Sequence, residues 1–161
     1  ELPMVQHAGY QRIAEILAAN HRRCYVVDDA TYLMQLDNFA RAKETGYGKF
    51  TDMALNFERV IEWSTQTDAD TIVYIMMHYD RDANGHMKPK TIGKMLDEKL
   101  TIEGCFDIVL YCQDQKFFTQ ANGQSVAKTP EGMFELEIPN DLKFVDTTIR
   151  NYYGMAKNEV K

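Results

Sequence analysis

The chain has 161 residues, enough for one domain with its own hydrophobic core. Hydrophobic residues make up 45% and charged residues 26% of it, as in ordinary globular proteins. No run approaches the roughly 20 apolar residues that a transmembrane helix needs, so we expect no membrane span. The net charge of −6 argues against a nucleic-acid footprint over the whole surface, although a local basic patch is still allowed.

The chain start and the cysteines favour a cytoplasmic protein. Glu1-Leu2-Pro3-Met4 has neither a basic start nor an apolar run, and it predicts no signal peptide. Cys24, Cys105 and Cys112 form no tight pair, and an odd count favours a reducing compartment over a disulfide framework. Their spacing to the histidines does not suggest zinc.

The first half of the chain alternates predicted helices and strands. Helical spacing of apolar residues predicts a helix over Tyr10–Asn20, and a short apolar run predicts a buried strand over Arg23–Val27. Helices are expected over Ala30–Lys43 and over Thr51–Gln66, the latter capped by its first residue. The run Thr71–Met77 is apolar on both faces, as is typical of a central parallel strand.

The predicted helices have apolar sides that should face a core. The stripe expected to face inward on the second helix is Leu33, Leu36, Phe39 and Ala40. The residues expected to do so on the third helix are Met53, Ala54, Phe57, Ile61 and Trp63. Two strands separated by such helices imply a parallel sheet with a right-handed crossover.

The second half predicts shorter elements joined by turns. Asn84-Gly85 predicts the turn of a hairpin within Tyr79–Lys88. A short helix, two strands and a closing helix are expected after it, at Thr91–Leu100, Phe106–Cys112, Lys116–Gln120 and Asp141–Tyr153. We therefore expect one α/β domain over residues 1–161, with a mainly parallel sheet and an antiparallel extension.

The strongest chemical motif is Cys24-Tyr25-Val26-Val27-Asp28-Asp29. Four apolar residues that run into two carboxylates are typical of a Walker B motif, which ends at the carboxyl edge of a parallel sheet. Asp28 there can hold Mg²⁺, directly or through water, and Asp29 can polarise an attacking water. In the alternative interpretation the two carboxylates only end a strand and cap the next helix.

Three other features have both a functional and a structural interpretation. His78 follows the second strand directly, where it can sense a γ-phosphate or can be an ordinary histidine at a strand end. Lys88, Lys90 and Lys94 can contact phosphates of a nucleotide or a nucleic acid, or form a solvated surface loop. Lys128 can reach a phosphate across a subunit interface, or can be a surface lysine.

Several separate segments, in the same order, resemble one family. The segments are 26–34, 42–50, 88–99 and 140–153, which read VVDDATYLM, AKETGYGKF, KPKTIGKMLDEK and NDLKFVD through YY. They resemble the RecA-like, AAA-type P-loop nucleotide-binding proteins of bacteriophages, which include single-strand-annealing recombination ATPases. The resemblance covers nearly the whole chain from about Tyr10 onward.

The resemblance implies a three-layer RecA-like core that binds ATP and Mg²⁺, forms oligomers and acts on DNA in an infected bacterial host. Asp28 and Asp29 match the Walker B acids of that family, and Asp28 would be the metal ligand. His78 matches its polar position at a strand end. Lys128 matches a residue that reaches the nucleotide of a neighbouring subunit.

The sequence departs from the family at the phosphate-binding loop. The family motif Gly-x-x-x-x-Gly-Lys-Thr/Ser occurs nowhere in the chain, and Gly46-Tyr47-Gly48-Lys49-Phe50 lacks both its spacing and its hydroxyl residue. We therefore expect a RecA-like domain without the N-terminal strand, P-loop and helix, which does not hydrolyse ATP alone.

The expected partners follow from the same departure. Self-association or a protein partner would cover the incomplete sheet, and single-stranded DNA would bind only weakly. The alternative function is a non-catalytic phage protein-binding module, such as an anti-defence inhibitor, that uses the remaining fold as a scaffold.

Overall fold

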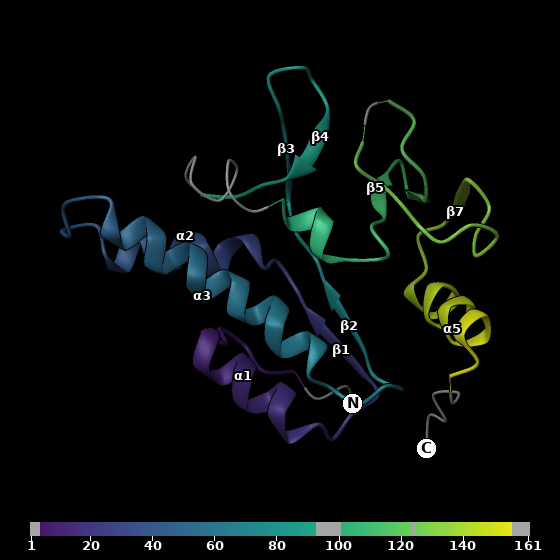
Figure 1. The fold of residues 1–161 in the computed structure, drawn as a ribbon, viewed down its shortest axis with the longest axis horizontal. Coiled ribbons are helices and arrows are strands. Elements are labelled where there is room, and N and C mark those ends of the chain that lie inside the picture. The colour runs from purple at the N-terminus through teal and green to yellow at the C-terminus, as the bar shows by residue number, and fades with distance from the viewer. Residues whose placement is uncertain (1–3, 93–100, 124, 156–161) are drawn as a thin grey trace. The chain divides into compact units, whose positions relative to one another are not determined.

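The computed structural model describes residues 4–92, 101–123 and 125–155, and these form a mixed α/β fold (Figure 1). The chain divides into two compact units. The first contains the described residues up to 77 together with residues 91 and 92, and the second contains residues 78–90 and those from 101 onward.

The first unit contains a two-stranded parallel sheet and three helices. Its elements are α1 (Tyr10–Ala19), β1 (Cys24–Val27), α2 (Thr31–Ala40), α3 (Gly48–Thr65) and β2 (Ile72–Ile75). Strands β1 and β2 lie side by side, with Cys24 opposite Ile72 and Val27 opposite Ile75 (Figure 1). The predicted parallel pairing of these two apolar runs is confirmed.

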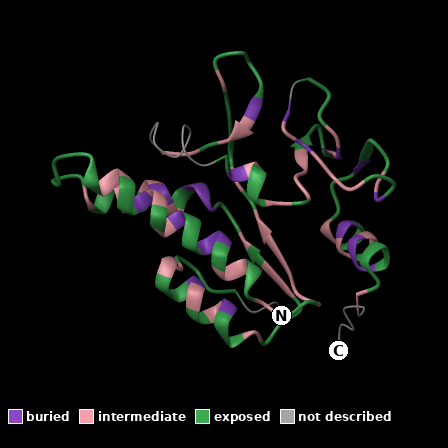
Figure 2. Cartoon of the chain, viewed as in Figure 1, coloured by how far each residue is buried: buried purple, intermediate pink, exposed green. Residues whose placement is uncertain are grey.

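One face of this sheet packs against α1 and α3. Ile13 and Leu17 of α1 and Val60 of α3 form a buried cluster. The strand residues packed against this cluster are Tyr25, Val27, Val73 and Ile75. They alternate along their strands, as side chains on one face of a sheet must. Figure 2 shows buried positions recurring along α1, α2 and α3, which is the amphipathic pattern of helices on a core.

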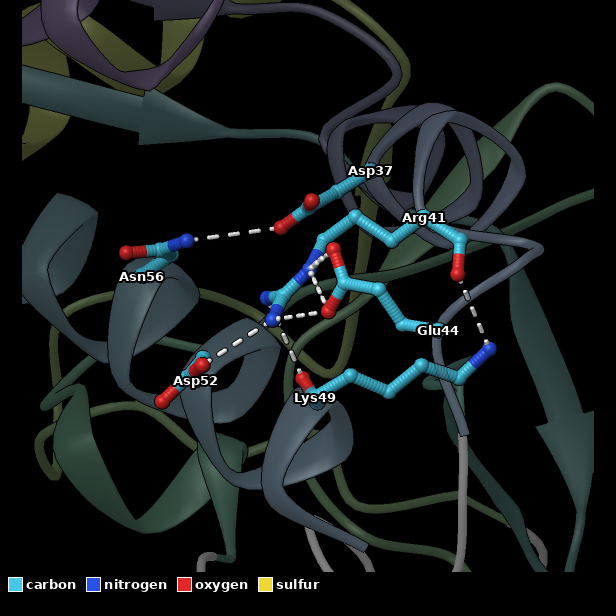
Figure 3. Close-up of polar contacts among 6 residues, drawn as sticks. All are labelled: Asp37, Arg41, Glu44, Lys49, Asp52 and Asn56. Carbon is cyan, nitrogen blue, oxygen red and sulfur yellow. Dashed lines mark hydrogen bonds and ion pairs between the residues drawn. The ribbon is translucent and has the colours of Figure 1, made fainter. Parts of the chain in front are cut away.

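Polar contacts fix α2 against α3 (Figure 3). The Arg41 guanidinium, which follows α2, lies 2.7 Å from Glu44 and 3.0 Å from Asp52 of α3. One turn earlier, the amide of Asn56 donates to Asp37 at 3.4 Å. The hydrogen bond from Arg41 holds the pKa of the Glu44 carboxyl below its usual value. The contacts of Arg41 with Asp52 and of Asn56 with Asp37 therefore join α2 and its C-terminal end to α3.

The predicted apolar stripe of α2 is therefore partly wrong. Leu33 packs against the core cluster, but Leu36 and Phe39 are 58% and 73% exposed. Ala30 and Met34 are the buried apolar residues instead. The physical reason is that α2 has apolar residues on two faces, and the burial of Thr31 and Met34 on one side leaves Leu36 and Phe39 at the surface.

The start of α3 also differs from the prediction. The helix begins at Gly48, so Thr51 lies inside its first turn and is not the cap. Gly46 has a φ of 95°, a conformation that glycine adopts readily, and the chain reverses there. The carbonyl of Tyr47 then accepts from the amides of Phe50 and Thr51 at 3.1 and 3.3 Å. The predicted inward positions Met53, Phe57 and Ile61 are confirmed as buried.

The second unit is built from short antiparallel strands and one long helix. Its elements are β3 (Tyr79–Arg81), β4 (Met87–Pro89), the 3₁₀ turn η1 (Ile102–Cys105), β5 (Tyr111–Gln113), β6 (Lys116–Phe118), β7 (Glu137–Pro139) and α5 (Leu142–Tyr153). β3 and β4 form the predicted hairpin, and a separate sheet has the order β5-β6-β7. The predicted closing helix is confirmed, and the Asp141 side chain caps it by accepting from two backbone amides.

Other predictions for this unit fail or fall outside the described residues. Most of the run Phe106–Cys112 is not a strand: β5 begins only at Tyr111, and before it Val109 makes an isolated bridge to Lys128. Strand β7 was not predicted. The helix predicted over Thr91–Leu100 falls largely on residues 93–100, which lie outside the described residues.

Candidate functional site

An acidic turn follows β1 at the carboxyl edge of the parallel sheet. Asp28 and Asp29 are both exposed. Asp29 has a φ of 50°, a left-handed conformation that aspartate tolerates better than most residues. The next amide, that of Ala30, donates to the carbonyl of Met76 just after β2 at 2.8 Å. The turn is therefore closed onto the end of the neighbouring strand.

The base of this turn is well packed. Ala30, Thr31 and Met34 have no exposed surface, so the first turn of α2 is anchored in the core directly after the two carboxylates. The backbone oxygen of Asp29 accepts from the amide of Tyr32 at 2.8 Å, which starts the helix. The acidic pair thus lies at the surface beside a well-packed helix start. As in the alternative interpretation, the two residues directly follow the end of β1, but the N-cap position of α2 is held by Ala30 and not by either aspartate.

The carboxylates of the acidic turn suit a magnesium ion that also binds water and substrate phosphates better than one that is surrounded by protein side chains. Mg²⁺ keeps several waters and is commonly held by one or two carboxylates together with substrate phosphates. Two adjacent exposed carboxylates, Asp28 and Asp29, meet that requirement. Within residues 4–92, 101–123 and 125–155, no group of three or more His, Cys, Asp or Glu side chains could enclose a metal.

His78 and Lys128 belong to the second unit. His78 is exposed, and its carbonyl accepts from the amide of Lys90 at 2.8 Å at the base of the β3–β4 hairpin. Lys128 is half-buried, and its backbone pairs with that of Val109 at 2.8 and 2.9 Å. The expected roles of His78 at a γ-phosphate and of Lys128 at a phosphate across a subunit interface stay predictions.

The predicted basic cluster is only partly described. Lys88 lies in β4 directly opposite Asp80 of β3, so an acidic neighbour offsets part of its charge. Lys90 follows the hairpin and is exposed. Lys94 lies outside the described residues. The hairpin is therefore a modest basic surface.

An aromatic arrangement beside this hairpin was not foreseen. The rings of Tyr79 and Tyr111 meet edge to face with centroids 5.7 Å apart, and the Phe118 ring lies 6.2 Å from that of Tyr111. Partial burial raises the pKa of the Tyr111 hydroxyl, and the nearby Tyr79 hydroxyl makes a smaller contribution in the same direction. Arg81, on the same strand as Tyr79, donates to the carbonyl of Gly85 at 3.0 Å. The sequence carried no signal for this contact, because the rings come from separate hairpins.

Comparisons of the chain with protein-family models, with curated proteins and with solved structures found no match. Among the helices described, none is both long enough and apolar enough to cross a bilayer.

Proposed function

We propose that this chain is the Walker B half of a phage-type RecA-like ATPase domain, related to the ATPases of DNA recombination and annealing. The observation that supports it best is the acidic turn. Asp28 and Asp29 directly follow a parallel strand, and the amide after them is bonded to the end of the adjacent strand. Ligands of open α/β sheets bind at this edge.

The roles of the residues follow from the chemistry of phosphoryl transfer. Asp28 holds Mg²⁺, directly or through water, and the ion neutralises charge on the phosphates when it is bound. Asp29 orients a water beside it. His78 senses the terminal phosphate, and Lys128 reaches the nucleotide of a neighbouring subunit.

The sheet itself supports a larger parent fold. Among the described residues, β1 and β2 each pair along one edge only. A two-stranded sheet is marginal by itself, and parallel strands normally have both faces covered. On β1, the side chain of Val26 is 49% exposed. In the three-layer RecA-like core that we propose, a further strand with its phosphate-binding loop completes this sheet.

The same proposal predicts that the chain alone does not turn over ATP. No Gly-x-x-x-x-Gly-Lys-Thr/Ser loop occurs in the sequence, so the backbone amides and the lysine that hold the β- and γ-phosphates are missing. Phosphate release from Mg·ATP, measured colorimetrically, is expected to match a protein-free blank. Turnover that Asp28→Ala abolishes and Asp82→Ala preserves would show that the chain is a complete ATPase.

The hairpin is the proposed contact for single-stranded DNA. Arg81 and Lys90 supply positive charge, and Tyr79 is 54% exposed beside the half-buried Tyr111. Bases stack on such rings while basic side chains contact phosphates. Because there are few phosphate contacts, binding should be weak and should fall steeply with salt.

Fluorescence anisotropy of a labelled oligothymidine across a salt series tests the contact. Tyr79→Ala should weaken binding at low salt, whereas the matched change Tyr153→Ala in α5, at a tyrosine that is 51% exposed, should not. Equal losses in both variants would remove the hairpin from the proposed interface.

A further inference from the structure

The outward face of α2 carries a continuous apolar stripe. Tyr32, Leu36 and Phe39 are 47%, 58% and 73% exposed, and their spacing places them in one row on a helix. The opposite side of α2 is held in the core by Met34 and against α3 by Asp37. A row of large apolar side chains at the surface typically marks an interaction site.

The charges at the two ends of this stripe are opposite. Asp28 and Asp29 precede α2, and Lys43 follows it; all three are exposed. Arg41, also at the basic end, is already engaged by two carboxylates, so Lys43 is the cation turned to the solvent there. In the sequence, Leu36 lies midway between Asp29 and Lys43, with an aromatic residue on either side.

Two copies of this stripe are complementary to each other when the second copy of α2 runs in the opposite direction. In an antiparallel arrangement about a two-fold axis at Leu36, each Tyr32 lies against the other copy's Phe39. The acidic end of one copy then meets the basic end of the other. The helix dipoles also oppose each other favourably in this arrangement. Two-fold symmetric contacts of this kind use the same patch on both subunits.

We propose that two copies of this chain associate through α2, packed antiparallel about Leu36, with the acidic turn of each copy facing Lys43 of the other. The occupant of the stripe is thus a second copy of the chain. One ten-residue helix per copy is a small contact, and interfaces under about 1,200 Å² are typically weak, so the dimer should be reversible. Association through α2 does not require that the chain bind a nucleotide.

Sedimentation velocity over a concentration series tests the apolar part. The wild type should show a rising sedimentation coefficient, and Leu36→Glu should remain a monomer because two carboxylates would meet at the axis. Leu36→Ala should weaken association by roughly tenfold. The matched control is Leu55→Glu in α3, a leucine that is 49% exposed, which should associate like the wild type.

Charge reversal tests the antiparallel register. Lys43→Glu and Asp28→Lys should each weaken the dimer, and the double variant should restore it because the opposite charges are exchanged. Circular dichroism of each variant confirms that the helices are kept. A wild type that stays monomeric, a Leu36→Glu variant that still dimerises, or a double reversal without recovery would overturn the proposal.

Discussion

Shortening Leu17 to alanine tests whether α1 covers the parallel sheet. Leu17 is 3% exposed and lies in the buried cluster with Ile13 and Val60. At about 0.8 kcal/mol per buried CH₂, the carbons that are lost cost about 2.4 kcal/mol, and the cavity that remains adds to this. We expect Leu17→Ala to lower the free energy of unfolding by about 3 kcal/mol. Leu55→Ala, at a leucine that is 49% exposed, should lower it by less than about 1 kcal/mol.

Urea unfolding followed by tryptophan fluorescence measures this difference. Trp63 is the sole tryptophan of the chain and packs against the same cluster, so its emission reports on the first unit. The urea concentration at the midpoint of unfolding should fall. The slope of the free energy of unfolding against urea concentration should stay the same if the substitution weakens native contacts without changing the compactness of the native or unfolded chain. Equal losses for Leu17→Ala and Leu55→Ala would refute the placement of α1 on the sheet.

Three further predictions concern the second unit. Asp141→Ala removes the cap of α5 and should lower the free energy of unfolding by about 1 kcal/mol. Urea unfolding followed by circular dichroism measures this change, and an unchanged stability would contradict the cap geometry. Asp146→Ala removes the carboxylate that lies 2.8 Å from the Arg150 guanidinium, whose side chain is 2% exposed. This change should lower the free energy of unfolding by about 3–5 kcal/mol. A decrease of less than about 1 kcal/mol would show that the pair is not buried. Hydrogen bonds from the backbone amides of His86 and, to a smaller extent, Asn84 hold the pKa of the Asp82 carboxyl below its usual value. The ionised carboxylate therefore stabilises the turn at pH values above the pKa of Asp82 in the unfolded chain. This stabilisation is lost in acid, as the pH falls through the lower pKa of Asp82 in the folded chain. NMR titration of the Asp82 carboxyl should find this low pKa, and an ordinary value would contradict the turn.

The sequence predicted the elements whose signal is local. Two strands that are apolar on both faces led directly to a parallel pair, and Asn84-Gly85 led to the hairpin. The run Asp141–Tyr153 likewise has apolar residues at helical spacing, and α5 ends at Tyr153, just before Gly154, where φ is positive. Such patterns need no knowledge of distant contacts.

What the sequence could not predict depends on contacts between distant segments. Leu36 and Phe39 face outward because Thr31 and Met34 are buried on the opposite side of α2, and a pattern of apolar residues does not show which side packs against other elements. Strand β7 has only three residues, and it is defined by its pairing with β6. The two carboxylates of the candidate site were found from their place after a strand, but the bond from Ala30 to Met76 that holds their turn appears only in three dimensions.

We propose that Asp28 is a divalent-metal ligand at the edge of the sheet. Residue-resolved NMR with Mn²⁺, which broadens the signals of amides near the ion, measures this directly in the isolated chain. We predict selective broadening at residues 28–32 that Mg²⁺ reverses and that Asp28→Asn abolishes, whereas Asp82→Asn leaves it unchanged. Broadening that centres on the β3–β4 hairpin, or that persists in Asp28→Asn, would contradict the Walker B assignment and favour a non-catalytic binding module.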